Sequence, residues 1–237
     1  STAAVSAPCR IRGAAASNAK ALNMIAYDIE CTISPFTGFG PRACELMRFF
    51  GMNLDGLRRR TLCHRLALTL SDGQICLLTG PSGAGKSVLL NALYAHTPPE
   101  SRIRIESIPL EADVAFIDAL DAPLAEALPV LTRAGLADLP ALLCPAAFLS
   151  DGQKWRARLA CALLSKKQYI FADECCAALD HTAACAVAWN LRRTATRTGR
   201  TFILAGCRED MLPDLSPDIL VRVAADRLDI LHGCPSA

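Results

Sequence analysis

One stretch of the chain has the spacing GxxxxGKS, which is typical of a loop that cradles nucleotide phosphates. Glycines let the backbone curl until successive N–H groups point at one anion, and a helix that begins at the loop adds its dipole. Lys86 would reach the β- and γ-phosphates, and the Ser87 hydroxyl would ligate Mg²⁺. The motif alone does not separate a kinase from an ATPase or a GTPase. The predicted phosphate-binding residues are Gly80, Pro81, Ser82, Gly83, Ala84, Gly85, Lys86, Ser87 and Val88.

A second stretch supplies the acids that a phosphate loop needs opposite it. The apolar run 169–172 is followed by Asp173 and Glu174. An acid at the end of a buried strand can hold the Mg²⁺ shell, which is the role predicted for Asp173. Glu174 is placed to polarise an attacking water as a general base. The catalytic residues predicted from the sequence are therefore Glu174, Lys86 and Asp173.

The elements around these residues alternate between strands and helices. Buried strands are predicted at 75–79 and 169–172, and a helix at 87–95 directly after the phosphate loop. Such alternation predicts an α/β fold with a mainly parallel sheet flanked by helices, and the phosphate loop between strand and helix makes it a P-loop NTPase. The remaining predictions are strands at 102–108, 114–117 and 201–205, helices at 122–143, 151–165 and 182–198, and a closing hairpin over 220–231.

Composition excludes several classes of protein. Across 237 residues the formal net charge is only +2, so nucleic acid binding is not indicated. No uninterrupted apolar run of membrane-spanning length occurs, and no transmembrane segment is predicted. The 12 cysteines form no CxxC pair, which favours small buried side chains over a metal site or a disulfide framework. These features favour a cytoplasmic protein.

The residues on either side of the acidic pair resemble those of a known family. Leu149-Ser150-Asp151-Gly152-Gln153 lies before a predicted helix, 23 residues ahead of Asp173, and Ala178-Leu179-Asp180 follows Glu174. This order and spacing resemble the ABC-type ATPases, whose signature loop is LSGGQ, over about residues 62–231. The resemblance implies ATP and Mg²⁺ as cofactors. It also divides the chain into an N-terminal segment of unknown fold at 1–45 and an ATP-binding domain at 46–237, with a helical subdomain at about 119–165.

The resemblance further implies a nucleotide-sandwich homodimer. In that family two domains pack head to tail, with ATP between the phosphate loop of one and the signature loop of the other. Ser150, Gly152 and Gln153 would then bind the nucleotide held by the partner, and Asp180 would lie at the dimer seam. Asp151 replaces the first glycine of the signature.

Three positions depart from the family pattern. Asp118 is the best match to the glutamine that follows the next strand, and it is predicted as an Mg²⁺ ligand with Ser87 and Asp173. Cys207 falls where the family has a histidine that senses the γ-phosphate, with Arg208 beside it as a candidate substitute. Phe49 or Phe50 is the nearest aromatic that could stack on adenine.

The expected function is Mg-dependent ATP hydrolysis by a soluble ABC-type ATPase that works on an unidentified protein partner. Only 64 residues separate Lys86 from Ser150, which is shorter than usual in transporter subunits of the family. Phe50-Gly51-Met52 and the details of the phosphate loop also resemble stand-alone ABC ATPases that occur fused to a predicted acetyltransferase domain. The alternatives are the ATP-binding subunit of a membrane transporter, a nucleotide-gated switch with little turnover, and a small-molecule kinase.

Overall fold

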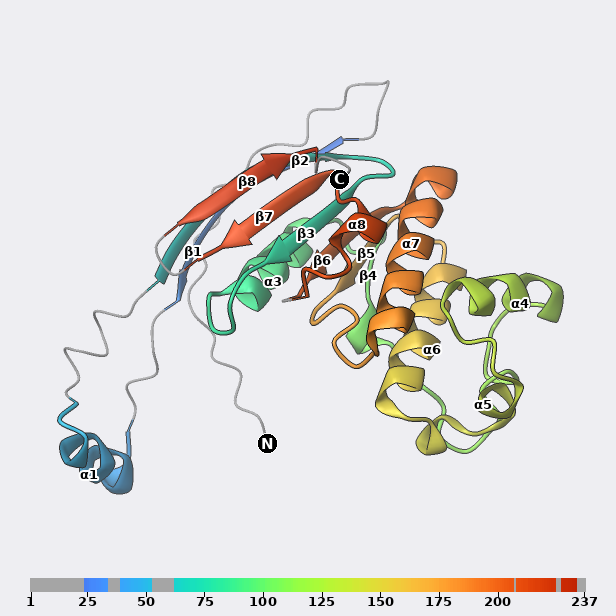
Figure 1. Ribbon diagram of the computed structural model, residues 1–237, viewed down its shortest axis with the longest axis horizontal. Helices are drawn as coiled ribbons and strands as arrows, with labels where there is room; N and C mark the ends of the chain where they lie inside the picture. The colour runs from blue at the N-terminus through green and yellow to red at the C-terminus, as the bar shows by residue number, and fades with distance from the viewer. Residues whose placement is uncertain (1–23, 34–38, 53–61, 207, 225–226, 234–237) are drawn as a thin grey trace.

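A computed structural model describes residues 24–33, 39–52, 62–206, 208–224 and 227–233. Its centre is a six-stranded sheet in the order β4-β5-β6-β3-β7-β8, in which only the β7–β8 pair is antiparallel (Figure 1). The fold is therefore the mainly parallel α/β class that the sequence predicts. The strands are β3 (Ile75–Thr79), β4 (Arg102–Arg104), β5 (Tyr169–Ala172), β6 (Thr201–Ala205), β7 (Ile219–Val223) and β8 (Leu228–His232).

The central strands are apolar on both faces because each face packs against its own core. Along β3, Ile75 and Leu77 enter one hydrophobic cluster, whereas Cys76 and Leu78 enter the other. This alternation is what a strand covered on both sides requires, because successive side chains point to opposite faces. The first cluster includes residues of α6 (Asp151–Leu164) and α7 (His181–Thr198), and the second includes residues of α3 (Lys86–His96).

A second, two-stranded sheet covers α3. It pairs β1 (Met24–Ile33) with β2 (Leu62–Ser71) in antiparallel register over ten residues each. Tyr27 of β1 is buried, and its hydroxyl lies 2.8 Å from the Thr97 hydroxyl at the end of α3. The sequence predicts no fold for residues 1–45, yet β1 lies inside that segment and contributes side chains to the hydrophobic core. The predicted boundary after residue 45 falls within α1 (Pro41–Phe49).

The helical subdomain is built from short elements. They are α4 (Leu124–Arg133), α5 (Leu139–Leu143) and η2 (Ala146–Phe148), which precede α6. The helix predicted over 122–143 is divided into α4 and α5: Gly135, at a φ of 76°, follows the end of α4, whereas Pro129 lies inside α4 without ending it. The strand predicted at 114–117 is wrong: this segment makes one bridge, Ala115 to Pro145, and a series of turns. The Phe116 and Ile117 N–H groups donate to the Cys144 and Leu142 carbonyls, so the segment follows α5 instead of the sheet.

The other helices are short. Helix α1 has no buried residue and lies apart from the layered body in Figure 1, while α8 (Leu212–Leu215) packs beside α7. A 3₁₀ turn, η1 (Ile105–Ser107), continues β4. No helix in the described part of the chain combines the length and the apolar character needed to cross a bilayer.

Candidate functional site

The predicted phosphate loop joins β3 to α3 in a conformation that needs its glycines. Gly83 and Gly85 have φ values of 79° and 102°, in the region that side chains disfavour, and Gly85 is the residue at which α3 begins. At Gly80 a Cβ atom would lie 2.1 Å from the Val223 carbonyl oxygen. The loop is therefore pressed against β7 at one end and curls into the helix N-terminus at the other.

Lys86 lies along this loop. Its ammonium donates to the Gly80 and Pro81 carbonyl oxygens at 2.7 and 2.8 Å. This ammonium lies at the N-terminus of α3, next to the backbone N–H groups of the curled loop. Together these groups form a wall that suits an anion.

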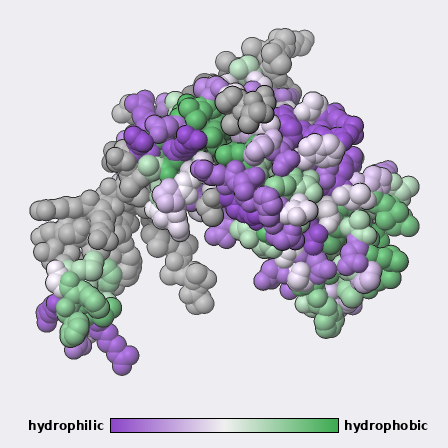
Figure 2. Space-filling view, viewed as in Figure 1, coloured by the Kyte–Doolittle hydropathy of each residue, from purple (hydrophilic) through white to green (hydrophobic). Residues whose placement is uncertain are grey.

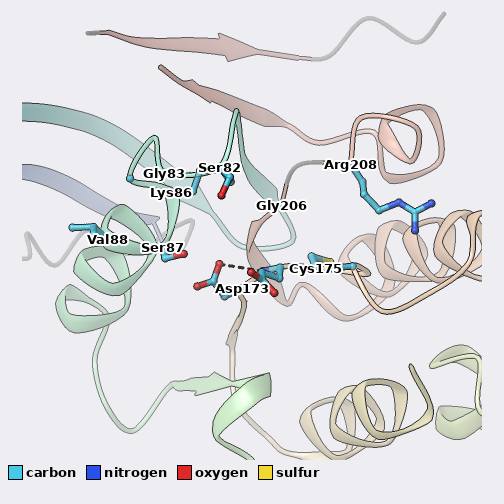
Figure 3. A pocket seen from close by; sticks show the side chains of 12 residues that line it. Ser82, Gly83, Lys86, Ser87, Val88, Asp173, Cys175, Gly206 and Arg208 are labelled. Carbon is cyan, nitrogen blue, oxygen red and sulfur yellow. Dashed lines mark hydrogen bonds between the residues drawn. The ribbon is translucent and has the colours of Figure 1, made fainter. Parts of the chain in front are cut away.

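A pocket of about 420 Å³ opens in front of this wall (Figure 3). Gly80, Pro81 and Ala84 belong to the loop but do not line the pocket. Its opposite wall comes from the end of β5 and the segment after β6, so the predicted catalytic residues Lys86, Asp173 and Glu174 are brought together. The lining residues are Ser82, Gly83, Gly85, Lys86, Ser87, Val88, Asp173, Glu174, Cys175, Ala177, Gly206 and Arg208.

A sharp turn after β5 positions the two acids. The Asp173 carboxylate accepts the Glu174 N–H at 3.0 Å, and Glu174 has a φ of 46°, which is unusual for a residue with a side chain. Cys176, at a φ of 60°, makes the same turn tighter. Strained backbone of this kind costs about 1–3 kcal/mol at each residue and clusters at functional sites. The Glu174 carboxylate is exposed on the wall of the pocket.

Sequence reasoning missed Glu106, which lies beside Asp173. It follows β4, the strand that pairs with β5, and its carboxylate accepts the Asp173 N–H at 2.9 Å. Arg104 of β4 donates to Glu106 at 3.1 Å and to Asp173 at 3.3 Å. Asp118, the predicted metal ligand, is exposed in the turn beside α5 and does not line the pocket. The pairing of β4 with β5 thus brings Glu106, and not Asp118, to the acidic pair.

Burial raises the pKa of Glu106, and the hydrogen bonds from Arg104 and the Asp173 N–H offset this only in part. A carboxyl with a raised folded-state pKa contributes stability below its unfolded pKa and loses it as the pH rises through the folded value. At neutral pH the ionised carboxylate is therefore a cost. We expect Glu106→Gln to raise the melting temperature at pH 7, and the gain over the unmodified protein to shrink as the pH falls towards 5.

Thermal melts at half-unit pH steps measure this effect. Glu111→Gln, which neutralises an exposed carboxylate, is the matched control and should show no pH-dependent gain. A Glu106→Gln protein that melts lower than the unmodified one at pH 7 would contradict the assigned direction.

The signature residues lie outside the pocket, at the start of α6. Ser150 caps that helix by accepting the Gln153 N–H at 3.3 Å, and Gln153 accepts the Ser150 N–H at 2.9 Å. At Gly152 a Cβ atom would lie 2.9 Å from the Ala178 carbonyl oxygen, so the loop packs on the segment after Glu174. Ser150 and Asp151 are exposed. The structure therefore presents a helix N-terminus outward, with Ser150, Gly152 and Gln153 grouped around it.

Arg208 lines the pocket, but its guanidinium points away from Lys86 (Figure 3). It binds both oxygens of Asp210, at 3.1 and 2.7 Å, and donates to the Leu179 carbonyl at 2.6 Å. Arg208, with His181, holds the pKa of Asp210 well below its usual range. Through its hydrogen bond to Leu179, Arg208 thus links the loop after β6 to the segment after Glu174. Cys207, predicted at the place of the family histidine, lies outside the described residues.

Three further side chains bear on the predicted site, namely Cys175, Phe49 and Phe50. The Cys175 thiol lies 3.7 Å from that of Cys176; this hydrogen bond, together with burial, raises the pKa of Cys175 well above its usual value, which disfavours the reactive thiolate. Phe49 and Phe50 pack edge to face at the end of α1, are largely exposed and do not line the pocket.

Known proteins match this chain in sequence and in fold. The family model described as "ABC transporter" matches residues 63–125. The "Aliphatic sulfonates import ATP-binding protein SsuB" of Yersinia pestis bv. Antiqua is 34% identical over 167 residues, which is 61% of this chain and 61% of that relative. The protein of the same name from Delftia acidovorans is 35% identical over 190 residues, 70% of this chain and 78% of the relative.

Solved structures share the fold. The dimeric ATP-binding cassette MJ0796 bound to ADP and Pi aligns with a TM-score of 0.59 at 17% identity, over 73% of this chain and 93% of that one. The sequence matches, the family model and the shared fold all point the same way: the chain belongs to the family of ABC-type ATPases, the ATP-binding cassettes.

Proposed function

We propose that this chain binds ATP with Mg²⁺ in the pocket between α3 and β5 and hydrolyses it. The observation that supports this most directly is the meeting of two walls with complementary chemistry. One wall offers Lys86 and the N-terminus of α3 to phosphates, and the other offers Asp173 and Glu174. Lys86 would bind the β- and γ-phosphates, and Glu174 would take a proton from the attacking water.

The oxygen donors present fit Mg²⁺. Ser87 and Asp173 offer a hydroxyl and a carboxylate to the pocket, the hard ligands that this ion prefers together with phosphate oxygens and water, and beside them the Glu106 carboxylate accepts the Asp173 N–H. Among the described residues no three acids, cysteines or histidines form a metal cage, and a nucleotide-bound Mg²⁺ needs only one or two carboxylates. The bound ion would neutralise charge on the phosphates. Arg104, which contacts both acids, would hold them in place before the ion binds.

We further propose that two copies complete each site. Ser150 is exposed at the N-terminus of α6, away from the pocket of its own chain, and such a terminus attracts an anion from outside. A head-to-tail dimer would place this helix N-terminus against the phosphates in the partner's pocket. The contact of Gly152 with the Ala178 carbonyl would couple the signature loop to the turn that positions Glu174.

Mixing two inactive variants tests the dimer. Ser150→Asp keeps a residue that caps helices well but brings a carboxylate towards the partner's phosphates, and Lys86→Ala disables the phosphate loop. We expect each variant alone to be inactive and an equal mixture to regain about a quarter of the activity, because half the dimers then contain one intact site. Full activity of Ser150→Asp alone would contradict the shared site.

A second candidate function is that of the ATP-binding subunit of a membrane transporter. An exposed apolar face on the helical subdomain supports it. Leu124 and Leu128 of α4, Leu139 and Leu143 of α5, and Phe148 are 45–80% exposed, and Figure 2 shows apolar surface over this region. Monomeric proteins rarely expose apolar side chains in such a group without a partner. The relatives named above are import ATP-binding proteins, which favours a protein partner at this face.

A further inference from the structure

A buried imidazole reaches the phosphate loop from the small sheet. His64 of β2 is 1% exposed, and its Nε2 lies 2.8 Å from the Ala84 carbonyl oxygen in the middle of the loop. A carbonyl can only accept, so Nε2 carries the proton and donates. The other ring nitrogen, Nδ1, is buried without a hydrogen-bond partner among the described residues. The ring therefore has one polar contact among the described residues, the hydrogen bond from Nε2 to the loop.

The hydrogen bond fixes the orientation of the peptide between Ala84 and Gly85. In a planar trans peptide the C=O and N–H groups point in opposite directions. With the Ala84 carbonyl held on His64, the Gly85 N–H points to the other side of the loop, where Gly85 lines the pocket. Gly85 has no Cβ atom to resist rotation of this peptide. An external anchor therefore decides which side the N–H faces.

We propose that His64 is a positioning residue for the phosphate loop, holding the Gly85 N–H towards the phosphates of the nucleotide. This inference rests on the proposed function of the pocket. His64 does not line the pocket, and it acts through the peptide that it holds.

Packing alone does not explain a histidine at this place. Ala84 is 4% exposed and belongs to the hydrophobic cluster that contains Leu66 and Leu89. A leucine at position 64 would fill that space, but it would leave the buried Ala84 carbonyl without a donor. A buried polar group left without its partner is costly, so the peptide would tend to turn until its carbonyl found another donor. The carbonyl then faces the pocket and repels phosphate.

The test compares His64→Leu with His64→Gln in the full chain. Glutamine places an N–H donor at a similar distance from the backbone, whereas leucine removes the donor. Isothermal titration with ATP and with ADP, each with Mg²⁺, gives the affinities. We expect His64→Leu to bind both nucleotides at least about tenfold more weakly, and His64→Gln to stay within about threefold of the unmodified protein.

Tyr27→Phe is the matched control. It removes another buried hydrogen bond, that of Tyr27 with Thr97, from the same layer but away from the loop. We expect it to lower the melting temperature about as much as His64→Leu while leaving nucleotide affinity unchanged. Nitrogen-15 NMR of the His64 ring should show a proton on Nε2, the nitrogen that donates to the Ala84 carbonyl.

Three results would overturn the inference. They are equal affinities of His64→Leu and the unmodified protein, an equal loss in Tyr27→Phe, and no rescue by glutamine. Failure of the unmodified protein to bind ATP would overturn the proposed function instead, so the two failures are distinguishable.

Discussion

Replacing Glu174 by glutamine is expected to stop turnover while ATP remains bound. The side chain is exposed on the pocket wall, on a turn strained at its own φ of 46°, opposite the phosphate loop. Glutamine keeps the shape of the side chain but cannot accept a proton from water. General-base catalysis typically contributes about 10²–10⁴ in rate, so turnover should fall at least about a hundredfold. Phosphate release measures the loss, and size exclusion with Mg²⁺ and ATP should show the stalled protein as a dimer.

The control for Glu174→Gln is Glu209→Gln, an exposed carboxylate that does not line the pocket. Its turnover should match that of the unmodified protein. Unchanged turnover in Glu174→Gln would remove Glu174 from the role of base. A Glu174→Gln protein that neither turns over nor binds ATP would show that Glu174 holds the fold of the turn instead.

Replacing Lys86 by alanine is expected to abolish tight nucleotide binding. Lys86 now donates to two carbonyls of its own loop, and the same ammonium would exchange them for phosphate oxygens. Hydrogen bonds that involve charged groups contribute about 1.5–3 kcal/mol each, which converts to a loss of roughly a hundredfold in ATP affinity. Isothermal titration with ATP in the presence of Mg²⁺ measures it.

Lys167→Ala is the matched control for Lys86→Ala. The Lys167 ammonium also donates to a backbone carbonyl, that of Glu100 at 2.8 Å, but it lies outside the pocket. The loss of such a bond should leave ATP affinity unchanged. Equal affinities of Lys86→Ala and the unmodified protein would mean that the loop does not hold the phosphates.

The predicted site residues that the structure brings together at the pocket are those placed by local geometry. The spacing of residues from Gly80 to Ser87 predicts a curled loop that leads into a helix, and the pocket lies against that loop. Asp173 and Glu174 follow a buried strand, and the ends of parallel strands meet at one edge of the sheet. The capping box of Ser150 and Gln153 likewise needs only residues three apart.

The residues that the sequence misses depend on contacts between distant segments. Asp118 follows an apolar run and Glu106 follows an alternating one, and only the pairing of β4 with β5 shows which acid reaches Asp173. Strand β1 went unassigned because its partner β2 begins 29 residues after β1 ends. His64 is 20 residues from Ala84, and no spacing rule links a strand histidine to a loop carbonyl.

The most direct test of the central claim is phosphate release from ATP by the purified, unmodified chain, with Mg²⁺ and again with EDTA. We expect steady turnover with Mg²⁺ that stops when the ion is chelated and is absent from Lys86→Ala. ATP that binds to the pocket and is never hydrolysed, at any protein concentration, would contradict the assignment of Glu174 and Asp173 as a working catalytic pair.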